Sequence, residues 1–524
     1  MSLNKDLISA RREEVSQSYN SAEATNYRLH LEGDDKATSK YIFQNQKEDA
    51  LAIVDKFYKN NRRVISIQKK TKVGADGLMI EIAKLLTTHS DDEFVVNPNN
   101  VRILTGMSNA GWEKDMKDKA PSCFKEKIFH HGKLSRSELC NINNGLFIID
   151  EIDTGDKEYQ VLHNTLKEAQ VLNVKHMNEH NNRFVFISAT MIKELHDLYT
   201  WGELHELYKM TIPDSYFGHK DFLDKGIVQE FYSLSSKENA NKWVKEDIIE
   251  NYRMDYRVHI VRVTTKTVEV VQNACIRQGV AFRNHTSTDR LLEDEIKEFF
   301  KEPLTQHIVL GVKGFFRRAN LIPNRWKLRI GATHELYTFT VDNNVQIQGL
   351  TGRMTGYWRT NIESGHKTGP HRTSIKAIEE YENTYNDPFG NNSYQTNGFK
   401  KKKGIVNAQA TMLSSKHILN LEAIDLPYIK EADPVIKIFK NQDEAKDYYN
   451  TILKEKMNGR GPETRKYSNT NHYEATIRGV TKLYSYDEVF SERKWGLNKT
   501  NFRFHPCYKD INDKSTLQWC LIHY

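Results

Sequence analysis

The sequence lacks most features of membrane, secreted or zinc-binding proteins. Its 5 cysteines lie far apart without any Cys-x-x-Cys pair, which indicates neither a zinc site nor a disulfide framework. No apolar run approaches the roughly 20 residues that a membrane span needs. The first residues, MSLNKDLISARREEV, contain no apolar core of a signal peptide. We therefore expect an intracellular protein that is not secreted, has reduced thiols and makes no membrane contact.

A large excess of one charge is also missing. The net charge of +7 and the pI near 8.8 are mildly basic, which is compatible with a polyanionic partner and also ordinary for a soluble protein. The length of 524 residues exceeds the roughly 250 to 300 residues that one hydrophobic core reaches. Several domains are expected.

Short apolar runs alternate with segments of helical spacing, which predicts an α/β fold with parallel sheets. The runs expected to be strands are 64–67, 101–104, 146–149, 184–188, 258–263 and 308–311. We expect an N-terminal extension outside any core (1–40), two α/β domains with central parallel sheets in tandem (41–215 and 216–400), and a smaller C-terminal α+β accessory module (401–524). A helix near 443–456 and a final strand at 517–524 are expected in that module.

The most informative stretch is Leu146–Asp153, an apolar run that ends in adjacent carboxylates. Ligands of open α/β sheets bind at the carboxyl ends of the strands. There Asp150 can hold Mg²⁺, and Glu151 can polarise the water that attacks a γ-phosphate. The alternative is a strand that ends in solvated acids.

Two later segments can complete such a site. Ser188, Ala189 and Thr190 follow another strand and can couple a nucleotide site to a neighbouring domain, although an N-cap is the alternative. Arg353 follows Gly352 at a turn, where a guanidinium can reach phosphates from a second domain. The alternative for Arg353 is a surface arginine at a helix start.

These blocks, in this order, resemble superfamily 2 helicases, the DEAD/DEAH-like class of nucleic-acid-dependent ATPases. Asp150–Asp153 resembles the DExD/H box, Ser188–Thr190 the S-A-T motif, and Gln348–Arg353 the late arginine motif. Phe43–Glu48 resembles the glutamine motif that recognises adenine through a residue such as Gln46, and Gly311–Asn320 the motif that links phosphate sensing to the nucleic-acid track. The sequence pattern Gln-Gly-Leu-x-Gly-Arg-Met-x-Gly-Tyr at 348–357 is similar to that of helicases of phages and large DNA viruses.

The resemblance covers roughly residues 41–360. It implies two RecA-like domains that clamp ATP and Mg²⁺ between them and grip one nucleic-acid strand, with DNA favoured and RNA the alternative. It also implies a location in the cytoplasm, at a nucleoid or at a viral replication site.

The phosphate loop departs from the family pattern Thr-Gly-x-Gly-Lys-Thr. Only Thr71 and Gly74 match, because Lys72 stands at a glycine position, Ala75 at the lysine and Asp76 at the Mg²⁺-binding hydroxyl. An alanine cannot neutralise phosphate charge, and an added carboxylate is repulsive unless a cation bridges the two. The loop therefore binds nucleotide in an unusual way with help from Lys72 or Lys70, or belongs to a degenerate ATPase, or is altered from an active parent.

Several further residues follow expected strand ends, where a phosphate backbone can lie. They are Thr105, Gly106, Ser108 and Trp112 in the first domain and Thr264, Lys266, Lys313 and Arg317 in the second. Trp112 can stack on a base, or it can pack the following helix. The leading hypothesis is an ATP-dependent helicase or translocase. Its rivals are a non-catalytic scaffold that binds nucleic acid or protein, and the motor subunit of a restriction or packaging machine, which requires a nuclease or capsid partner. A protein partner is also expected to be able to bind through the C-terminal module.

Overall fold

The computed structural model describes most of the chain and divides it into two compact units, Met1–Leu421 and Glu422–Tyr524. The described residues are 5–89, 95–107, 109–130, 133, 136–155, 157, 160–286, 289–301, 303–314, 316, 318, 321–414, 435–455, 457, 473–477, 480–486, 488 and 502–523. The division between the units lies later in the chain than residue 401, where the accessory module was expected to begin.

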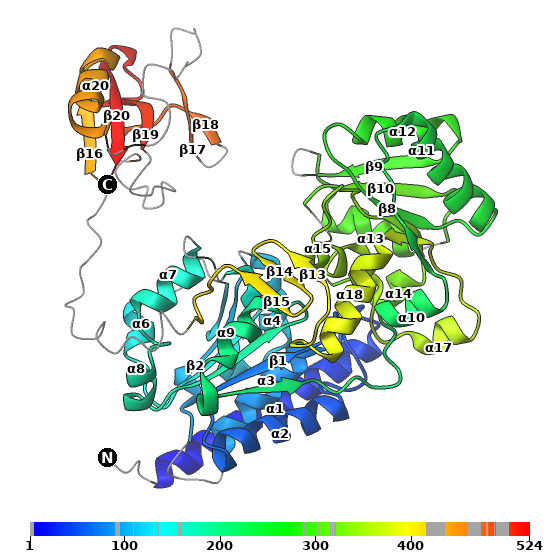
Figure 1. Cartoon of the computed structure of the whole chain (residues 1–524), viewed down its shortest axis with the longest axis horizontal. Coiled ribbons are helices and arrows are strands. Elements are labelled where there is room, and N and C mark those ends of the chain that lie inside the picture. The colour runs from blue at the N-terminus through cyan, green and yellow to red at the C-terminus, as the bar shows by residue number, and fades with distance from the viewer. Residues whose placement is uncertain are drawn as a thin grey trace. The chain divides into compact units, whose positions relative to one another are not determined.

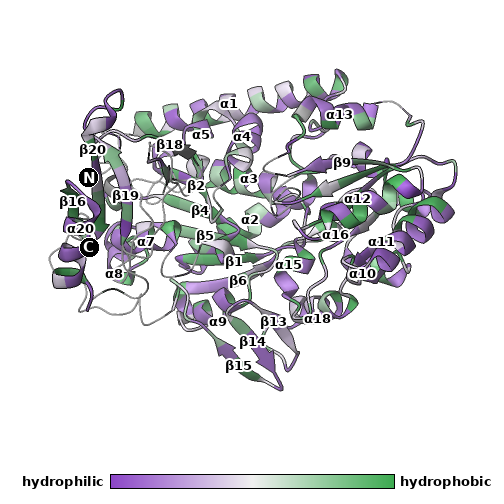
Figure 2. Cartoon of the chain, turned by 90° about the horizontal axis from the view of Figure 1, so that it is seen from above, coloured by the Kyte–Doolittle hydropathy of each residue, from purple (hydrophilic) through white to green (hydrophobic). Residues whose placement is uncertain are grey.

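The first unit contains a six-stranded parallel sheet with the strand order β3-β2-β4-β5-β1-β6 (Figure 1). We call this sheet with its helices domain 1. Its strands are β1 (Val64–Gln68), β2 (Val101–Thr105), β3 (Ile128–His130), β4 (Leu146–Asp150), β5 (Arg183–Ser188) and β6 (His205–Lys209). Strands β1, β4 and β5 are buried along their whole length and appear hydrophobic in Figure 2. Parallel strands covered on both faces carry continuous apolar runs, which is why the sequence predicts these three.

Helices cover both faces of this sheet. Ile65, Ile67 and Ile148 face one core, whereas Val64, Phe147 and Ile149 face the other. The helices of the first side are α1 (Lys5–Leu31), α2 (Gln44–Lys59), α3 (Ala75–Thr88), α4 (Ala110–Lys119) and α5 (Ser122–Lys125). Those of the second are α6 (Arg136–Cys140), α7 (Val161–Glu168), α8 (Val174–Glu179) and α9 (Lys193–Tyr199).

Helix α1 differs from the extension expected for the first residues. It is 27 residues long, and its Val15 and Tyr19 are buried in the first core. The Tyr19 hydroxyl donates to Glu81 Oε2 at 2.8 Å. The expectation that this segment stays outside a core is wrong, because only a few apolar residues on one side of a polar helix make the contact.

A second six-stranded parallel sheet follows, with the order β7-β12-β11-β8-β10-β9. It defines domain 2, drawn in green to yellow in Figure 1. Its strands are β7 (Val228–Glu230), β8 (Val258–Arg262), β9 (Ala281–His285), β10 (Ile308–Val312), β11 (Ile330–His334) and β12 (His371–Thr373). Its helices are α10 (His219–Asp224), α11 (Lys237–Lys242) with a π-helical continuation (Trp243–Glu250), α12 (Val268–Arg277), α13 (Glu293–Lys301), α14 (Asn324–Lys327), α15 (Asn343–Ile347), α16 (Leu350–Met354), α17 (Arg359–Glu363) and α18 (Ile375–Asn386). The predicted fold class, two RecA-like domains in tandem, is confirmed.

After α18 the chain forms a small antiparallel sheet that sequence analysis does not predict. Its strands are β13 (Tyr394–Thr396), β14 (Phe399–Lys402) and β15 (Ile405–Ala408), in that order. These strands are only three or four residues long, so no hydrophobic alternation can be read from the sequence.

The second unit is a small α+β module, as predicted. Strands β16 (Val435–Phe439), β19 (Arg503–Tyr508) and β20 (Leu517–His523) form an antiparallel sheet in the order β16-β20-β19. The hairpin of β17 (Ala475–Ile477) and β18 (Val480–Lys482) accompanies it, together with α20 (Gln442–Tyr448) and a π-helical turn (Tyr449–Leu453). In neither unit is any described helix long and apolar enough to cross a bilayer.

Candidate nucleotide site between the two sheets

Three neighbouring strands of domain 1 direct polar loops to one edge of the sheet. Strands β4, β5 and β1 are adjacent and parallel, so the residues that follow them meet at their carboxyl ends. Here lies a cavity of about 260 Å³. Its lining includes the phosphate loop with Asp150 and Glu151 from domain 1, and Gln348, Arg353 and Tyr357 from domain 2.

The two acids at the end of β4, Asp150 and Glu151, are buried and already bound by protein donors. Asp150 Oδ1 accepts a hydrogen bond from Lys69 Nζ at 2.9 Å, and Oδ2 accepts from the Trp112 indole at 3.2 Å. Glu151 has a left-handed backbone with φ of 51°, and its Oε1 lies 3.7 Å from Lys69 Nζ. Burial raises the pKa of Glu151 above its ordinary value, although the charge of Lys69 opposes that shift. A carboxyl with a raised pKa is suited to proton transfer.

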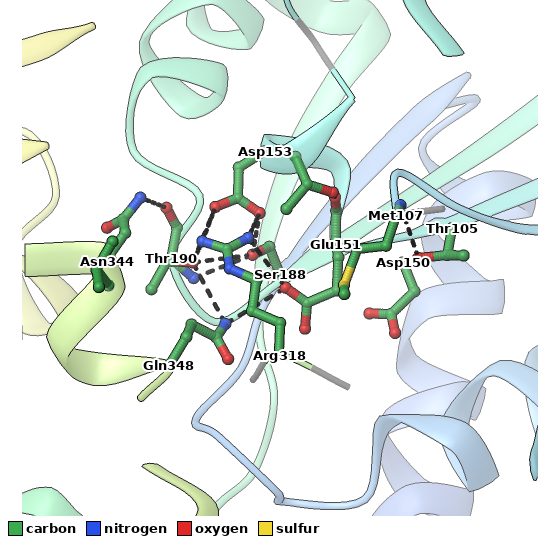
Figure 3. A network of polar contacts seen from close by, with 12 residues as sticks. Thr105, Met107, Asp150, Glu151, Asp153, Ser188, Thr190, Arg318, Asn344 and Gln348 are labelled. Atoms are coloured by element: carbon green, nitrogen blue, oxygen red, sulfur yellow. Dashed lines mark hydrogen bonds and ion pairs between the residues drawn. The ribbon is translucent and has the colours of Figure 1, made fainter. Parts of the chain in front are cut away.

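An arginine from domain 2 reaches the same loop (Figure 3). Arg318 Nη1 and Nη2 lie 2.8 and 2.7 Å from the two carboxylate oxygens of Asp153, and Nη1 lies 3.2 Å from Glu151 Oε2. Burial would raise the pKa of Asp153, but the charge and hydrogen bonds of Arg318 outweigh it and lower that pKa. Arginine matches a carboxylate with two parallel hydrogen bonds, so this pair fixes geometry as well as charge.

The S-A-T segment shares this network. The hydroxyls of Ser188 and Thr190 donate to Asp153 at 2.8 and 2.9 Å. Thr190 Oγ1 also accepts from Arg318 Nη2 at 2.8 Å, while Ala189 lines the cavity. Thr190 is therefore bonded to residues of both domains, which is the geometry that a coupling residue needs.

The late arginine motif lies on the domain 2 side of the cavity. Gln348 Nε2 approaches Glu151 Oε2 at 3.3 Å, and Gln348 Oε1 accepts from Arg353 Nη2 at 3.0 Å. Burial lowers the pKa of Arg353 to about 10. Gly352 packs so tightly that an added Cβ would lie 2.0 Å from the Ile347 carbonyl oxygen, so only glycine fits there.

The phosphate loop is held by domain 2 as well as by its own turn. Thr71 O accepts hydrogen bonds from the hydroxyls of Tyr216 and Thr355, at 2.7 and 2.9 Å. Lys70 Nζ pairs with Glu382 at 2.6 Å and lies 3.7 Å from the centre of the Tyr385 ring. The loop conformation therefore depends on contacts from outside its own sequence.

Lys72 occupies the expected glycine position with φ of 56°, and Gly74 follows with φ of 93°. The Lys72 side chain lines the cavity, where burial and then the charge of Arg353 lower its pKa well below the ordinary value.

The two other departures, Ala75 and Asp76, open α3. The Asp76 carboxylate pairs with Lys119 Nζ at 2.7 Å. Burial would raise the pKa of Asp76, but the charge of Lys119 and its hydrogen bond lower it to about 2. The extra negative charge at the loop is thus balanced by a lysine from α4.

Gln46 lies over the phosphate loop. Its side-chain oxygen accepts from the Phe43 amide at 2.8 Å, and its amide group donates to the Gly74 carbonyl. An added Cβ at Gly77 would lie 2.5 Å from Gln46 Oε1. Adenine recognition by Gln46 stays a prediction, and in this structure the side chain ties the N-terminus of α2 to the loop.

Of the candidate nucleic-acid residues that the structure describes, most lie at or just after strand ends, whereas Trp112 lies in α4. Thr105 is buried at the end of β2, Gly106 N donates to Asp150 O at 3.0 Å, and Trp112 is 5% exposed. Stacking of Trp112 on a base would require its displacement from Asp150. In domain 2 the residues are more accessible, and Lys313 Nζ, which is exposed, donates to Thr265 Oγ1 at 2.9 Å.

Thr264 and Thr267 close a turn after β8, and Lys266 is exposed within it. Ser108 and Arg317 lie outside the described residues. Nucleic-acid contact by any of these side chains stays a prediction.

Sequence reasoning missed Lys69 and did not assign Arg318 to the carboxylates. Each had one signal in its position: Lys69 directly follows β1, and Arg318 follows β10 by a short loop. Their partners come from distant parts of the chain, so only the folded arrangement reveals them.

No family model and no curated protein sequence matches the chain. Among solved structures, it is similar to S. cerevisiae Dbp5 bound to RNA and ADP BeF3, with 12% identity, a TM-score of 0.37, and coverage of 68% of this chain and 94% of that chain. The DEAD-box helicase Mss116 bound to ssRNA and UDP-BeF matches with 12% identity, a TM-score of 0.31, and coverage of 77% and 74%. The Sulfolobus solfataricus SWI2/SNF2 ATPase core in complex with dsDNA matches with 12% identity, a TM-score of 0.25, and coverage of 62% and 86%. At such low sequence identities and TM-scores, the role of each residue follows from its own contacts in this structure.

Proposed function

We propose that this chain is a nucleic-acid-dependent ATPase of helicase or translocase type, a member of superfamily 2. The observation that carries the proposal is the position of Glu151. It lies at the carboxyl end of a parallel strand, within 3.7 Å of Lys69 and 3.2 Å of Arg318. A buried acid with cations from both domains is suited to a reaction in which closure of the domains completes the site.

In this proposal Glu151 orients and deprotonates the attacking water, and Arg353 stabilises charge on the transferred phosphoryl group. Asp150 would hold Mg²⁺, which supplies positive charge to the phosphates. The Lys69 ammonium at 2.9 Å stands in for such a cation, so the carboxylate suits one. Arg318, Thr190 and Gln348 hold Glu151 and Asp153 in place when the two domains meet.

Phosphate binding falls to Lys72 in place of the missing lysine at position 75. Its left-handed backbone and its place in the cavity lining bring the side chain beside Arg353, while Lys119 balances Asp76. Thr71, Gly74 and the N-terminus of α3 at Ala75 and Asp76 supply backbone amides for the phosphates. The nucleic-acid partner, DNA before RNA, would contact the strand ends that carry Thr105 and Lys266.

The test is ATP hydrolysis by the full chain with and without single-stranded DNA or RNA. Glu151→Gln should reduce stimulated turnover by about 10² to 10⁴-fold and leave ATP binding largely intact. Unchanged turnover in this variant would remove Glu151 from the reaction. Glu298→Gln, which alters an exposed acid of α13 that pairs with Lys301, is a control for the loss of a carboxylate.

A second candidate function is a non-catalytic scaffold with the same fold. It is favoured by the Lys69–Asp150 and Lys119–Asp76 ion pairs, which satisfy the charges of the site without nucleotide. A scaffold would bind nucleic acid or protein but would not hydrolyse ATP. Absence of turnover in the unmodified chain, with normal nucleic-acid binding, would select this alternative.

A further inference from the structure

The small sheet β13–β15 carries a run of positive charge that the site does not use. Residues 388–421 contain no aspartate or glutamate, and four consecutive lysines, 400–403, lie within them. In the sheet, Lys401 is buried and donates to Pro388 O at 2.8 Å. Lys400 and Lys402 are exposed on the opposite face of β14, because successive side chains of a strand alternate.

Strand β15 extends this exposed surface. It pairs on one side with β14, and all four of its residues are exposed. Ile405 lies opposite Lys402 and is 73% exposed, and Asn407 lies opposite Lys400. Lys403 lies at the turn between the strands with a left-handed φ of 51°. We call Lys400, Lys402, Lys403, Ile405 and Asn407 the basic face.

Two exposed aromatic rings lie next to this sheet. Tyr199 and Phe389 are 72% and 43% exposed, and their ring centres are 5.3 Å apart. The centre of the His196 ring lies 5.1 Å from that of Phe389 and 5.4 Å from that of Phe399, the first residue of β14. Phe399 and Lys401 share the buried face of β14, so this aromatic cluster packs on the side of the sheet opposite the basic face.

The sheet is fixed to both domains. On the domain 2 side, Asp342 accepts from Thr396 Oγ1 and from the Asn397 amide, both at 2.8 Å. On the domain 1 side, Asp197 accepts from the Thr411 amide at 2.9 Å, and the Trp201 indole donates to Leu413 O at 2.7 Å. The segment 394–413, which contains the sheet, is therefore hydrogen-bonded to both domains.

A short chain of hydrogen bonds joins the sheet to the candidate nucleotide site. The Tyr394 hydroxyl donates to Asn344 Oδ1, and Asn344 Nδ2 donates to Thr190 O at 3.2 Å. Figure 3 places Asn344 beside Thr190, whose hydroxyl belongs to the network of Asp153 and Arg318. The side chains of Tyr394, in β13, and Asn344 thus link the sheet to the S-A-T segment.

We propose that the basic face binds the phosphate backbone of single-stranded nucleic acid and that Tyr394 and Asn344 pass this binding to Thr190. A run without acids suits a polyanion, since it offers cations with no internal carboxylate to neutralise them. Phosphate contacts of this kind carry no sequence information. The surface lies beyond the strand-end residues of the proposed function, and its coupling to Thr190 rests on that function.

Binding is tested on the full chain without nucleotide, using fluorescence anisotropy of labelled oligo-dT and oligo-U of about 20 nucleotides. Lys400→Glu with Lys402→Glu should raise Kd about tenfold or more. It should also reduce the slope of log K against log salt by about 1.4, because each phosphate contact on a single strand contributes about 0.7. The neutral pair Lys400→Gln and Lys402→Gln should give the same slope change with a smaller rise in Kd.

The matched control is Lys225→Glu with Lys237→Glu, two exposed lysines of domain 2 and the same change in charge. An unchanged Kd in the Lys400 and Lys402 variants, or an equal loss in the control, would overturn the proposal. So would loss of binding to poly-glutamate with intact oligonucleotide binding, which would identify an acidic protein partner instead.

Coupling is tested with Tyr394→Phe, which removes one hydroxyl. Oligonucleotide Kd should stay unchanged while stimulation of ATP hydrolysis falls severalfold, and Tyr27→Phe on α1 should alter neither. Full stimulation in Tyr394→Phe would overturn the coupling. Absence of any ATP hydrolysis in the unmodified chain would instead contradict the proposed function, and the binding test would stand.

Discussion

Arg318 and Asp153 join the two RecA-like domains through two parallel hydrogen bonds of 2.8 and 2.7 Å (Figure 3). Asp153 is the last residue of the segment that begins with Asp150, and Arg318 follows a strand of the other sheet. The pair therefore forms only when the domains approach each other. Its position beside Glu151 makes the proposed catalytic geometry depend on that approach.

Replacing Arg318 should thus impair catalysis more than folding. Arg318→Lys keeps the charge but loses the planar two-bond contact, and we expect stimulated turnover to fall about 10²-fold, as for loss of one preorganised donor. A double-mutant cycle with Asp153→Asn should give a coupling energy of about 0.5 to 3 kcal/mol. Arg283→Lys, an exposed change on β9, is the control, and strictly additive effects would argue against the pair.

The role of Lys72 predicts a linkage between nucleotide binding and protons. Burial and the charge of Arg353 lower its pKa in the free protein, and a bound phosphate would raise it again. Binding then takes up protons at pH values between the two pKa values, so ATP affinity should fall as pH rises through that window. Calorimetry in buffers of different ionisation enthalpy measures this uptake.

Lys72→Met should weaken ATP binding and remove most of the uptake. A small proton uptake should remain in this variant because of Lys327, whose pKa is lowered by burial to about 7. Lys59→Met, at an exposed lysine of α2, should change neither quantity. Equal proton uptake by Lys72→Met and the unmodified chain would exclude Lys72 as the phosphate ligand.

Sequence patterns predicted the buried strands because their apolar runs are a direct consequence of burial on both faces. They also placed Asp150, Ser188 and Thr190 at strand ends that turned out to be neighbours. The partners of these residues could not be predicted in the same way. Arg318 follows β10 and Arg353 lies in α16, and only the packing decides which of them bonds Asp153.

Polar or short elements escaped prediction for a related reason. Helix α1 contributes only a few residues to a core, and β13–β15 alternate too briefly for a period to be read. The left-handed Lys72 likewise follows Thr71, whose carbonyl oxygen accepts hydrogen bonds from the distant Tyr216 and Thr355. The sequence around a residue does not specify the contacts that the other domain makes with it.

A buried histidine pair in domain 2 predicts loss of stability in acid. The Ala332 amide donates to His259 Nδ1 at 2.9 Å, and His259 Nε2 lies 3.1 Å from His307 Nδ1. His307 Nε2 lies 3.0 Å from the Arg253 carbonyl. These partners require both rings to be neutral, and burial lowers the pKa of each.

Because the folded pKa values lie below the unfolded value of about 6.5, the unfolded chain binds more protons in acid. The stability that the neutral pair provides is complete above that pH and is lost progressively as pH falls below it. Urea unfolding at about pH 7 and pH 5 should give a lower midpoint at pH 5. His259→Gln should reduce this difference, whereas His30→Gln, at an exposed residue of α1, should leave it unchanged; an unaltered pH dependence in His259→Gln would contradict the assignment.

Restoring the family residues to the phosphate loop separates a compensated motor from a disabled one. If Lys72 does the work of the missing lysine, the chain as it stands hydrolyses ATP, and Ala75→Lys with Asp76→Thr changes turnover by less than about tenfold, or 1.4 kcal/mol in activation free energy. If the site is disabled, turnover appears only in the restored variant. Asp76→Asn is an informative control, because it frees Lys119 from its 2.7 Å ion pair without adding a lysine. Should Asp76→Asn alone increase ATP affinity, the released Lys119 supplies the phosphate charge, and the departure at position 76 acts as a brake on an otherwise competent loop.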